Sequence, residues 1–394
     1  MFTDLVVLEL ASVLAGPRVG QFFAELGATV LKVENPRTRG DVTRHWHLPT
    51  EPEHDDRPSY FASCNSGKQS VALDLMTEAG RALLHQLAEQ SDIVIASYRP
   101  GSAERLGADP ETLRAINPGL LYGHITGYGP DEPRAGYDAV IQAESGFMHM
   151  NGSPEGPPTK MPVALMDVLT AHQLKEALLI GLLRRERTGK GSYFPVSLMQ
   201  AAVSGLVNQA TNWLVGGHVP QRMGSAHPNI APYGTVYRTA DDEALLLAVG
   251  TDRQFTRLCA ILGLNDVPDD NRFTTNAARV RHREALNGKL APAIAEWSRD
   301  ALLDELDTQG VPAGAINDMR QVFEQPLAQA MMLPFGDAPT GLRTTAFEND
   351  TADDLLPPPH YAEHTETVLR KRLGCSPRQI QQYEREGVAQ LRTV

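Results

Sequence analysis

Short apolar runs alternate with helix-length amphipathic stretches over the first third of the chain, and this alternation constrains the fold more than any other feature. The runs expected to be strands are residues 5–8, 28–33, 70–75, 92–96 and 120–125. Helices are expected between them at residues 18–25 and 78–89. Because strands that alternate with helices form βαβ units, the pattern predicts an α/β fold with a Rossmann-like parallel sheet and helices on both faces. Ligands of such sheets lie beyond the carboxyl ends of the strands.

Chain length and a change in composition divide the sequence further. At roughly 150 residues per domain, 394 residues suffice for two or three domains. Residues 217–237 are rich in Gly, Pro, His and Asn, and a strand-like run at 244–249 follows them. Later helices are expected at 253–262, at 283–296 and from residue 377. We expect a large Rossmann-like domain at 1–216, a small α/β domain with linkers at 217–330, and a C-terminal segment at 331–394 that returns to the large domain.

Charge and cysteine content exclude several classes of protein. The net charge is −12 and no basic tract carries interleaved aromatic residues, so nucleic-acid binding is not expected. The cysteines Cys64, Cys259 and Cys375 have no CxxC spacing, which argues against a disulfide framework or zinc site and for a reducing compartment. No apolar run reaches about 18 residues, and the N-terminus indicates a first strand rather than a signal peptide. We expect a cytoplasmic protein without a membrane segment or a metal.

The first βαβ unit raises the question of a dinucleotide site. Glu34 ends the second expected strand, where an acid that binds a ribose would lie. Residues 11–17 between the strands contain one glycine and a proline instead of GxGxxG, so the backbone cannot approach a pyrophosphate in that manner. A nicotinamide-dependent oxidoreductase is therefore disfavoured.

Asp167 is a lone carboxylate where the short apolar run 161–166 turns into a long helix. An apolar stripe at helical spacing follows it and ends at Thr188-Gly189, which places Asp167 at or near the start of that helix. With an unperturbed pKa of about 3.9, the carboxylate is expected to be ionised at neutral pH. Taken alone, Asp167 is better explained as an N-cap, a role that any helix start can use.

An ordered set of motifs gives the Asp167 segment a more specific interpretation. The motifs are Ala15-Gly-Pro17, residues 27–34, Gly40-Asp41, residues 70–75, Tyr98-Arg-Pro-Gly101, Arg105-Leu-Gly107, Gly127-Tyr-Gly129, Gly136-Tyr-Asp138, the Asp167 segment, Gly310-Val-Pro312 and Glu363-His-Thr365. In this order they resemble the family III CoA-transferases, among them formyl-CoA:oxalate and carnitine CoA-transferases. The resemblance covers nearly the whole chain and implies a CoA-binding large domain and an interlocked homodimer.

By this resemblance Asp167 is the nucleophile. It would attack the donor thioester to give a mixed anhydride, and the released CoA thiolate would then form an aspartyl-CoA thioester before the acceptor acid repeats the steps in reverse. Covalent catalysis of this kind divides one difficult acyl transfer into easier steps. Asp138 matches a transferase acid near the nucleophile. CoA thioesters are substrates, and no permanently bound cofactor is implied.

The resemblance also implies a set of CoA contacts. Arg105 matches a CoA-binding arginine of the family directly, whereas Arg37 and Arg39 are alternatives, because their loop is one residue longer than in formyl-CoA transferase. Arginines in loops after predicted strands can meet the phosphates of CoA. The family's lysine before Tyr137 falls at Ala135, and whether Arg134 substitutes for it is open. The expected contacts are Leu14, Ala15, Arg37, Arg39, Leu73, Asp74, Leu75, Ser97, Tyr98, Arg99, Arg105, Arg134 and Tyr137.

Two departures from formyl-CoA transferase bear on the acceptor acid. Leu14 stands where that enzyme has a glutamine, which argues against oxalate. The loop at 226–233 resembles transferases that move CoA from succinyl-CoA to glutarate, itaconate, mesaconate or citramalate. His227 and Asn229 could donate hydrogen bonds to a remote carboxylate. A structural loop turned by its two prolines explains them equally well.

Two other functions remain open at this point. The 2-methylacyl-CoA racemases resemble this chain but have Gly-His-Asp where it has Gly136-Tyr137-Asp138, so the imidazole that would serve as a second base is missing. A catalytically silent CoA-binding protein that kept the fold is the other alternative. The expected partners are an acyl-CoA, an organic acid and a second copy of the chain.

Overall fold

The computed structural model describes residues 1–336, 338–347 and 355–392. The chain divides into two compact units, which are described separately below. The first unit comprises Met1–Ser145, Met161–Leu214 and Ala330–Val394, and the second comprises Gly146–Lys160 and Val215–Gln329.

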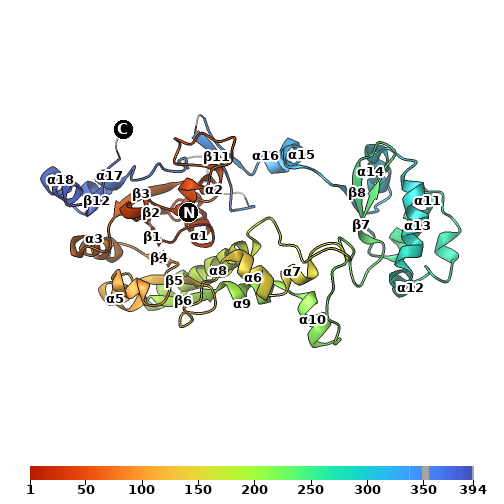
Figure 1. The fold of residues 1–394 in the computed structure, drawn as a ribbon, viewed down its shortest axis with the longest axis horizontal. Coiled ribbons are helices and arrows are strands. Elements are labelled where there is room, and N and C mark those ends of the chain that lie inside the picture. The colour runs from red at the N-terminus through yellow and green to blue at the C-terminus, as the bar shows by residue number, and fades with distance from the viewer. Residues whose placement is uncertain (337, 348–354, 393–394) are drawn as a thin grey trace. The chain divides into compact units, whose positions relative to one another are not determined.

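A mostly parallel sheet forms the centre of the first unit (Figure 1). Its strands are β1 (Val6–Leu10), β2 (Thr29–Glu34), β3 (Lys68–Leu73), β4 (Ile93–Ala96), β5 (Leu121–Thr126), β6 (Ser192–Ser197) and β12 (Ala389–Gln390). The order across the sheet is β12-β3-β2-β1-β4-β5-β6, and only β12 runs antiparallel to its neighbour. The α/β class with a parallel sheet is confirmed, and each expected strand lies within about two residues of an observed one.

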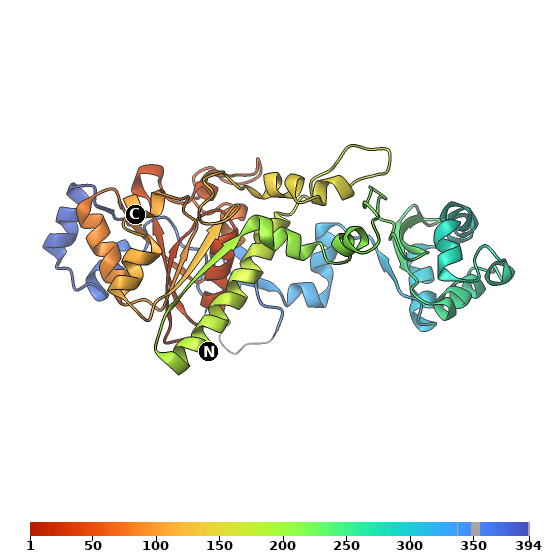
Figure 2. The same ribbon diagram turned by 90° about the horizontal axis from the view of Figure 1, so that it is seen from below.

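Helices cover both faces of this sheet (Figure 2). The helices of the first unit are α1 (Ala15–Glu25), η1 (Pro36–Thr38), η2 (Val42–His45), α2 (Ser59–Ala62), α3 (Glu78–Glu89), α4 (Ser102–Arg105), α5 (Pro110–Ile116), α6 (Asp138–Glu144), α8 (Leu165–Thr188), α9 (Leu198–Gly205), α10 (Asn208–Leu214), α17 (Thr365–Lys371) and α18 (Pro377–Arg385). One buried core joins α3, α5, α17 and α18 to the sheet. Helices α1 and α8 pack against each other and against strands of the same sheet.

Helix α1 begins three residues before the predicted start at residue 18. The difference arises from Pro17, which breaks a helix interior but fits the first turn, where its missing N–H has no helical partner to lose. A close approach fixes this start, because a Cβ on Gly16 would lie 2.3 Å from the Cβ of Ala11. Helix α1 therefore starts directly against the residue that follows β1.

The C-terminal segment returns to the first unit. It contains the hairpin β10 (Met332–Phe335) and β11 (Ala338–Leu342), and its last strand, β12, pairs with β3 in the register Ala389↔Leu73. The expected helix from residue 377 is α18, whose start carries a capping box between Ser376 and Gln379.

The second unit contains an antiparallel three-stranded sheet with helices packed on it. Its elements are α7 (Phe147–Met150), β7 (Tyr233–Arg238), β8 (Ala244–Ala248), α11 (Asp252–Ile261), η3 (Val267–Asp269), α12 (Asn276–Arg281), α13 (Arg283–Ile294), α14 (Arg299–Thr308), β9 (Ala313–Ala315), α15 (Met319–Glu324) and α16 (Pro326–Gln329). The sheet order is β7-β8-β9, and residues of β8, α11, α13 and α14 form a separate core. The predicted strand and two helices correspond to β8, α11 and α13.

No helix in the described residues has the length and apolar character needed to cross a bilayer. The longest, α8, has 24 residues and ends at Gly189, whose φ of 67° is the left-handed conformation that glycine adopts at a helix C-terminus.

Candidate active site

Two cavities open at the carboxyl ends of the central strands. Strand β1 pairs with β2 on one side and β4 on the other, so the chain leaves β1 at the point where the strand order reverses. Ligands of parallel sheets bind at such a point. The Asp167 cavity, of about 370 Å³, is lined by residues 12–16 after β1, residues 97–100 after β4, and Asp167. A neighbouring cavity of about 410 Å³ shares Ser12, Val42, Ser97 and Tyr98 with it.

Asp167 is a half-buried residue in the first turn of α8. The N-cap of this helix is Ala164, so the N-cap explanation of Asp167 is wrong. Within the part of the chain that the structure describes, no group donates a hydrogen bond to its carboxylate. Burial, and then the nearby charge of Asp138, raise the pKa of Asp167 to about 7. The expectation that the carboxylate keeps an ordinary pKa is therefore corrected.

Asp138 is held in place by two hydrogen bonds. One oxygen accepts from the backbone N–H of Met166 at 2.8 Å, and the other accepts from the side chain of Gln142 at 2.7 Å. Because Met166 lies in the first turn of α8, Asp138 caps the helix that carries Asp167. Its carboxylate is therefore fixed by the fold while it raises the pKa of its neighbour.

A contact between two glycines brings the Asp138 loop to this position. A Cβ on Gly136 would lie 2.4 Å from the Cα of Gly127, the residue that follows β5. Only backbone without side chains can approach this closely. The two glycine motifs that stood apart in the sequence thus pack against each other beside the cavity.

The structure brings most of the expected residues around one cavity. Besides Asp167, the Asp167 cavity is lined by the expected residues Leu14, Ala15, Ser97, Tyr98, Arg99, Arg134, Tyr137 and Asp138. A match to a family model described as CoA-transferase family III spans residues 2–365. The chain belongs to CoA-transferase family III.

Individual relatives agree with this assignment. The chain is 40% identical to the succinate–glutarate CoA-transferase of Agrobacterium fabrum, over 92% of this chain and 93% of that protein. It is 33% identical to the human succinyl-CoA:glutarate CoA-transferase, over 97% of this chain and 88% of that protein. Its structure matches the crystal structure of a CaiB/BaiF family protein from Brucella suis with a TM-score of 0.81, at 40% identity over 93% of this chain and 98% of that one. The predicted family and enzyme class are confirmed.

Several expected CoA contacts of this family III CoA-transferase lie outside the Asp167 cavity. Arg37 in η1 pairs with Asp74, with its Nε 2.8 Å from a carboxylate oxygen. Arg39 has a left-handed φ of 54° and lines a third cavity. Arg105 is an exposed residue at the end of α4.

Leu73 and Leu75 point into the core, where they are 1% and 7% exposed. Their side chains therefore have no free surface to offer, and only the backbone of this segment could meet a ligand. Contacts through the backbone would explain why the expected CoA contacts include apolar, acidic and hydroxyl residues alike.

The charge of Arg134 is engaged within its own loop. Its guanidinium pairs with Glu144 at 2.8 Å and stacks 3.7 Å from the ring centroid of Tyr128. Tyr137 is 64% exposed at the rim of the cavity. By the resemblance, the family's lysine falls at Ala135, next to Arg134. The charge of Arg134 is already balanced by the carboxylate of Glu144.

Two aromatic residues at or beside the cavity, Trp46 and Tyr60, were not predicted from the sequence. Trp46 lines the Asp167 cavity and meets Tyr60 edge to face at a centroid distance of 4.9 Å. Burial, and then the charge of Asp167, raise the pKa of Tyr60 to about 12, so its phenol stays protonated and can donate a hydrogen bond. The only signal in the sequence that pointed to Trp46 was its place shortly after the Gly40-Asp41 motif. Tyr60 lies in a separate helix, α2, and no motif pointed to it.

His227 and Asn229 belong to the second unit. The His227 ring accepts the Asn229 backbone N–H at 3.1 Å and packs edge to face on Tyr233. Arg283 donates to the His227 carbonyl at 2.5 Å, and Asn276 donates to the Asn229 carbonyl at 2.8 Å. The loop is therefore anchored through its backbone, which leaves the Asn229 amide uninvolved in these contacts.

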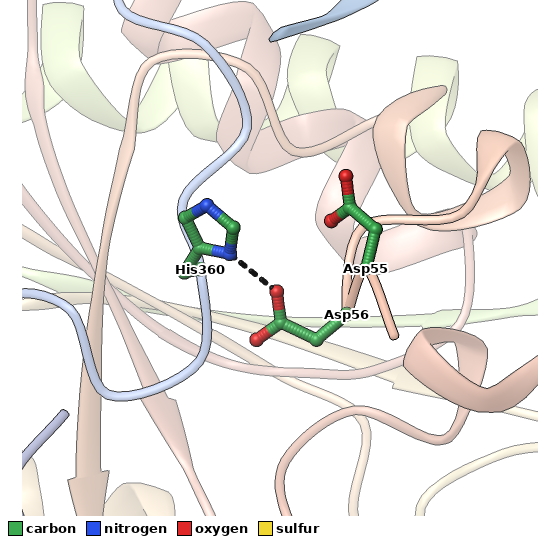
Figure 3. A group of neighbouring side chains, drawn as sticks. All are labelled: Asp55, Asp56 and His360. Atoms are coloured by element: carbon green, nitrogen blue, oxygen red, sulfur yellow. Dashed lines mark hydrogen bonds and ion pairs between the residues drawn. The ribbon is translucent and has the colours of Figure 1, made fainter. Parts of the chain in front are cut away.

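One group of side chains has the composition of a metal site. Asp55, Asp56 and His360 lie close together, and His360 is 2.6 Å from an oxygen of Asp56 (Figure 3). Asp55 is already paired with Arg57 at 3.0 Å, while Asp56 accepts the N–H of Tyr361 at 2.6 Å. Because a metal would have to displace these partners, the group is better explained as a link between the two chain segments.

Proposed function

We propose that this enzyme transfers CoA from succinyl-CoA to a short dicarboxylic acid of the itaconate, mesaconate, citramalate or glutarate type, with Asp167 as the nucleophile. The observation that carries the proposal is the Asp167 carboxylate, which lines a cavity at the switch point of the sheet and receives no hydrogen bond from the described residues. A carboxylate that serves only the fold would normally be paired. The relatives named for succinate and glutarate support the choice of substrates.

The proposed transfer needs no external proton or oxidant. The Asp167 carboxylate attacks the succinyl carbonyl, the C–S bond breaks, and the CoA thiolate leaves a mixed anhydride. The thiolate then attacks the Asp167 carbonyl, which releases succinate and leaves an aspartyl-CoA thioester. The acceptor carboxylate attacks this thioester to form a second anhydride and the thiolate. Attack of the thiolate on the acceptor carbonyl gives the new acyl-CoA and restores the Asp167 carboxylate.

The electrostatics of the site suit this chemistry. A carboxylate with a raised pKa is a stronger nucleophile than an ordinary one, because nucleophilicity rises with basicity. Its partial burial also means that little solvation has to be removed before it attacks. Asp138 would contribute by holding the start of α8 and by keeping the Asp167 carboxylate reactive.

For CoA we propose a path along the carboxyl ends of β1, β2 and β4. Ser97 and Tyr98 line both cavities there, while Leu14, Ala15 and Arg99 line the Asp167 cavity. Exposed Arg105 and the Arg37 or Arg39 guanidinium would meet the phosphates, and the backbone of Leu73, Asp74 and Leu75 would pass beside the nucleotide. Arg134 and Tyr137 would border the acyl end. For His227 and Asn229 of the second unit, we retain the proposal that they can donate hydrogen bonds to a carboxylate.

We further propose a homodimer located in the cytoplasm. Trp213 and Leu214 of α10 are 54% and 75% exposed, which is unusual for large apolar side chains and suits a protein interface. The cysteines Cys64, Cys259 and Cys375 are all free, as expected in a reducing compartment.

Isotope exchange tests the reaction class. The enzyme is incubated with succinyl-CoA and labelled glutarate, mesaconate, itaconate or citramalate in deuterated water. Label in an acyl-CoA that depends on the succinyl-CoA donor supports the transferase. Deuterium at the alpha carbon of a 2-methylacyl-CoA without transfer would identify a racemase, and CoA binding without either reaction would indicate a silent binder.

A further inference from the structure

Val13, in the turn between β1 and α1, has a backbone conformation that its side chain disfavours. Its φ is 73°, in the left-handed region, where a β-branched residue is an outlier with a strained backbone. Such strain persists only where surrounding groups hold it. The Val13 N–H lies 3.2 Å from each carboxylate oxygen of Asp41, and the Val13 carbonyl accepts from the thiol of Cys64 at 3.6 Å.

Asp41 is well placed to hold this turn. Its side chain is 1% exposed and lies 2.9 Å from the ammonium of Lys32. It also accepts from the backbone N–H and the hydroxyl of Thr43, at 3.1 Å and 2.9 Å, which caps η2. Burial opposes ionisation, but the Lys32 charge and these hydrogen bonds outweigh it and lower the pKa of Asp41. The carboxylate therefore stays ionised at neutral pH.

The ion pairs extend beneath the whole turn. Lys32 lies 3.0 Å from Glu9 and donates to the carbonyl of Ala11 at 3.0 Å. Lys68 lies 2.8 Å from Glu9 and donates to the carbonyl of Pro17 at 2.8 Å. The carbonyls before and after the turn are thus both held by buried ammonium groups. The carboxylates of Glu9 and Asp41 balance the charges of the Lys32 and Lys68 ammonium groups. The network therefore acts mainly by fixing the positions of the backbone groups that it binds.

The turn held in this way borders the reacting carboxylate. Residues 12–16 line the Asp167 cavity, and α1 begins at Ala15 without a side-chain cap or an acidic residue in its first turn. The first N–H groups of a helix carry partial positive charge. Donors fixed at the place where negative charge develops lower the barrier to acyl transfer.

We propose that Asp41 is a positioning residue: through the Val13 turn, it sets the start of α1 against the carboxyl groups that react at Asp167. The inference rests on the proposed function, because the reacting groups are those of the acyl transfer. It adds a residue that is remote from the substrate but determines the shape of the cavity wall.

Three variants test this role: Asp41→Asn, Val13→Gly and the double variant. Asp41→Asn removes the charge that binds Lys32 and one of the two acceptors of the Val13 N–H. We expect kcat for CoA transfer to fall about 10–100-fold, with a smaller change in KM, because the cavity wall would move by up to about 1 Å. Glycine adopts φ near 73° without strain. The kcat of the double variant should therefore be at least about tenfold higher than the kcat of Asp41→Asn.

Asp92→Asn is the matched control. Asp92 accepts the N–H of Val6 at 2.8 Å and pairs with Arg185 at 3.0 Å, so it combines the same two kinds of contact at the opposite end of β1. We expect it to change the melting temperature with little effect on kcat. A loss of kcat in Asp41→Asn that equals the loss in Asp92→Asn, or that Val13→Gly fails to relieve, would overturn the positioning role.

Amide hydrogen exchange gives a second readout that does not depend on catalysis or on a folded Asp41 variant. In the wild type, the Val13 amide should be protected by its bond to Asp41; exchange as fast as in an open loop would refute the inference. In Asp41→Asn, protection should be lost at Val13 and retained in β4. A wild type that transfers no CoA would refute the proposed function, whereas the exchange pattern would still show whether Asp41 holds the turn.

Discussion

At the residue scale, the central fact is that Asp167 occupies an unfavourable place for a charge. It is half-buried, lacks a hydrogen-bond donor among the described residues, and stands near the Asp138 carboxylate. Groups whose pKa is strongly shifted in a cavity are frequently functional. The ionised Asp167 carboxylate lowers the stability of the folded state, and the same environment makes the carboxylate more reactive.

The pH dependence of transfer follows from this environment. Since only the ionised carboxylate attacks, kcat should fall about tenfold per pH unit below a midpoint near 7, the value to which the pKa of Asp167 is raised. Asp138→Asn removes the neighbouring charge and should move the midpoint to lower pH. Rates measured between pH 5 and 9 for both proteins check this. A wild-type midpoint near 4, or a midpoint that rises in Asp138→Asn, would contradict the account.

Stability should respond in the opposite sense. A raised carboxylate pKa means that the folded state loses stability as pH rises from the unfolded-state value near 4 to about 7. Asp167→Asn removes this loss, so it should stabilise the protein by on the order of 2 kcal/mol at pH 8, after allowance for partial solvent access. At pH 4 the gain should be absent. Denaturant unfolding at the two pH values measures it, and a gain that is equal at both would be evidence against the raised pKa.

The sequence identified Asp167 through its motif but gave no indication of its pKa. The shift depends on burial first and then on the charge of Asp138, which is 29 positions away and reaches the start of α8 only through the packing of its loop. Trp46 and Tyr60 escaped prediction for the same reason, because nothing local in the sequence shows that Trp46 lines the cavity or that Tyr60 of α2 packs against its ring.

At the element scale, the site is built from turns after strands that are held by close backbone contacts. Strands and helices with clear apolar periodicity, such as β4, α3 and α11, were predicted within a residue or two. The turns between them were not, because their shape depends on tertiary contacts such as the Asp41 bond to Val13. Pro17 similarly gave no indication that α1 begins before it.

Substitution of Gly136 tests the loop that carries Asp138. In Gly136→Ala, the new methyl group would overlap the Cα of Gly127, so we expect a loss of about 1–3 kcal/mol in the free energy of unfolding and a reduced transfer rate. Gly288→Ala is the control, since Gly288 lies in α13 and no atom of the described residues, apart from its own helix backbone and chain neighbours, lies within 4 Å of the position of its missing Cβ. It should stabilise by about 0.5–1 kcal/mol. Equal effects of the two substitutions on stability would exclude the close contact.

At the scale of the whole molecule, the alternation of apolar runs with helix-length stretches predicted the α/β class, and the ordered motifs predicted the family. Length and a change in composition led to the expectation of a second, smaller domain. Composition could not show which residues of a chain with net charge −12 meet an anionic ligand. The structure shows that Arg37 and Arg134 are paired with Asp74 and Glu144, which reduces the charge that they offer.

The proposed homodimer leads to a prediction about assembly. The native mass should be twice the 43.0 kDa of one chain. Leu214→Glu, in exposed α10, should shift the protein toward the monomer, because a charge in an apolar interface is costly. Light scattering after size exclusion checks both. Glu186→Gln, an exposed change within α8, should leave the mass unaltered. A wild type with the mass of one chain at micromolar concentration would contradict the dimer.

The most direct test of the account is the covalent state of Asp167 during turnover. The protein is incubated with succinyl-CoA, trapped with hydroxylamine and mapped by peptide mass spectrometry, with Asp167→Asn treated in parallel. We predict a hydroxamate at Asp167 in the wild type and no modification in the variant. CoA transfer that proceeds while Asp167 stays unmodified, or that persists at a normal rate in Asp167→Asn, would contradict its role as the nucleophile.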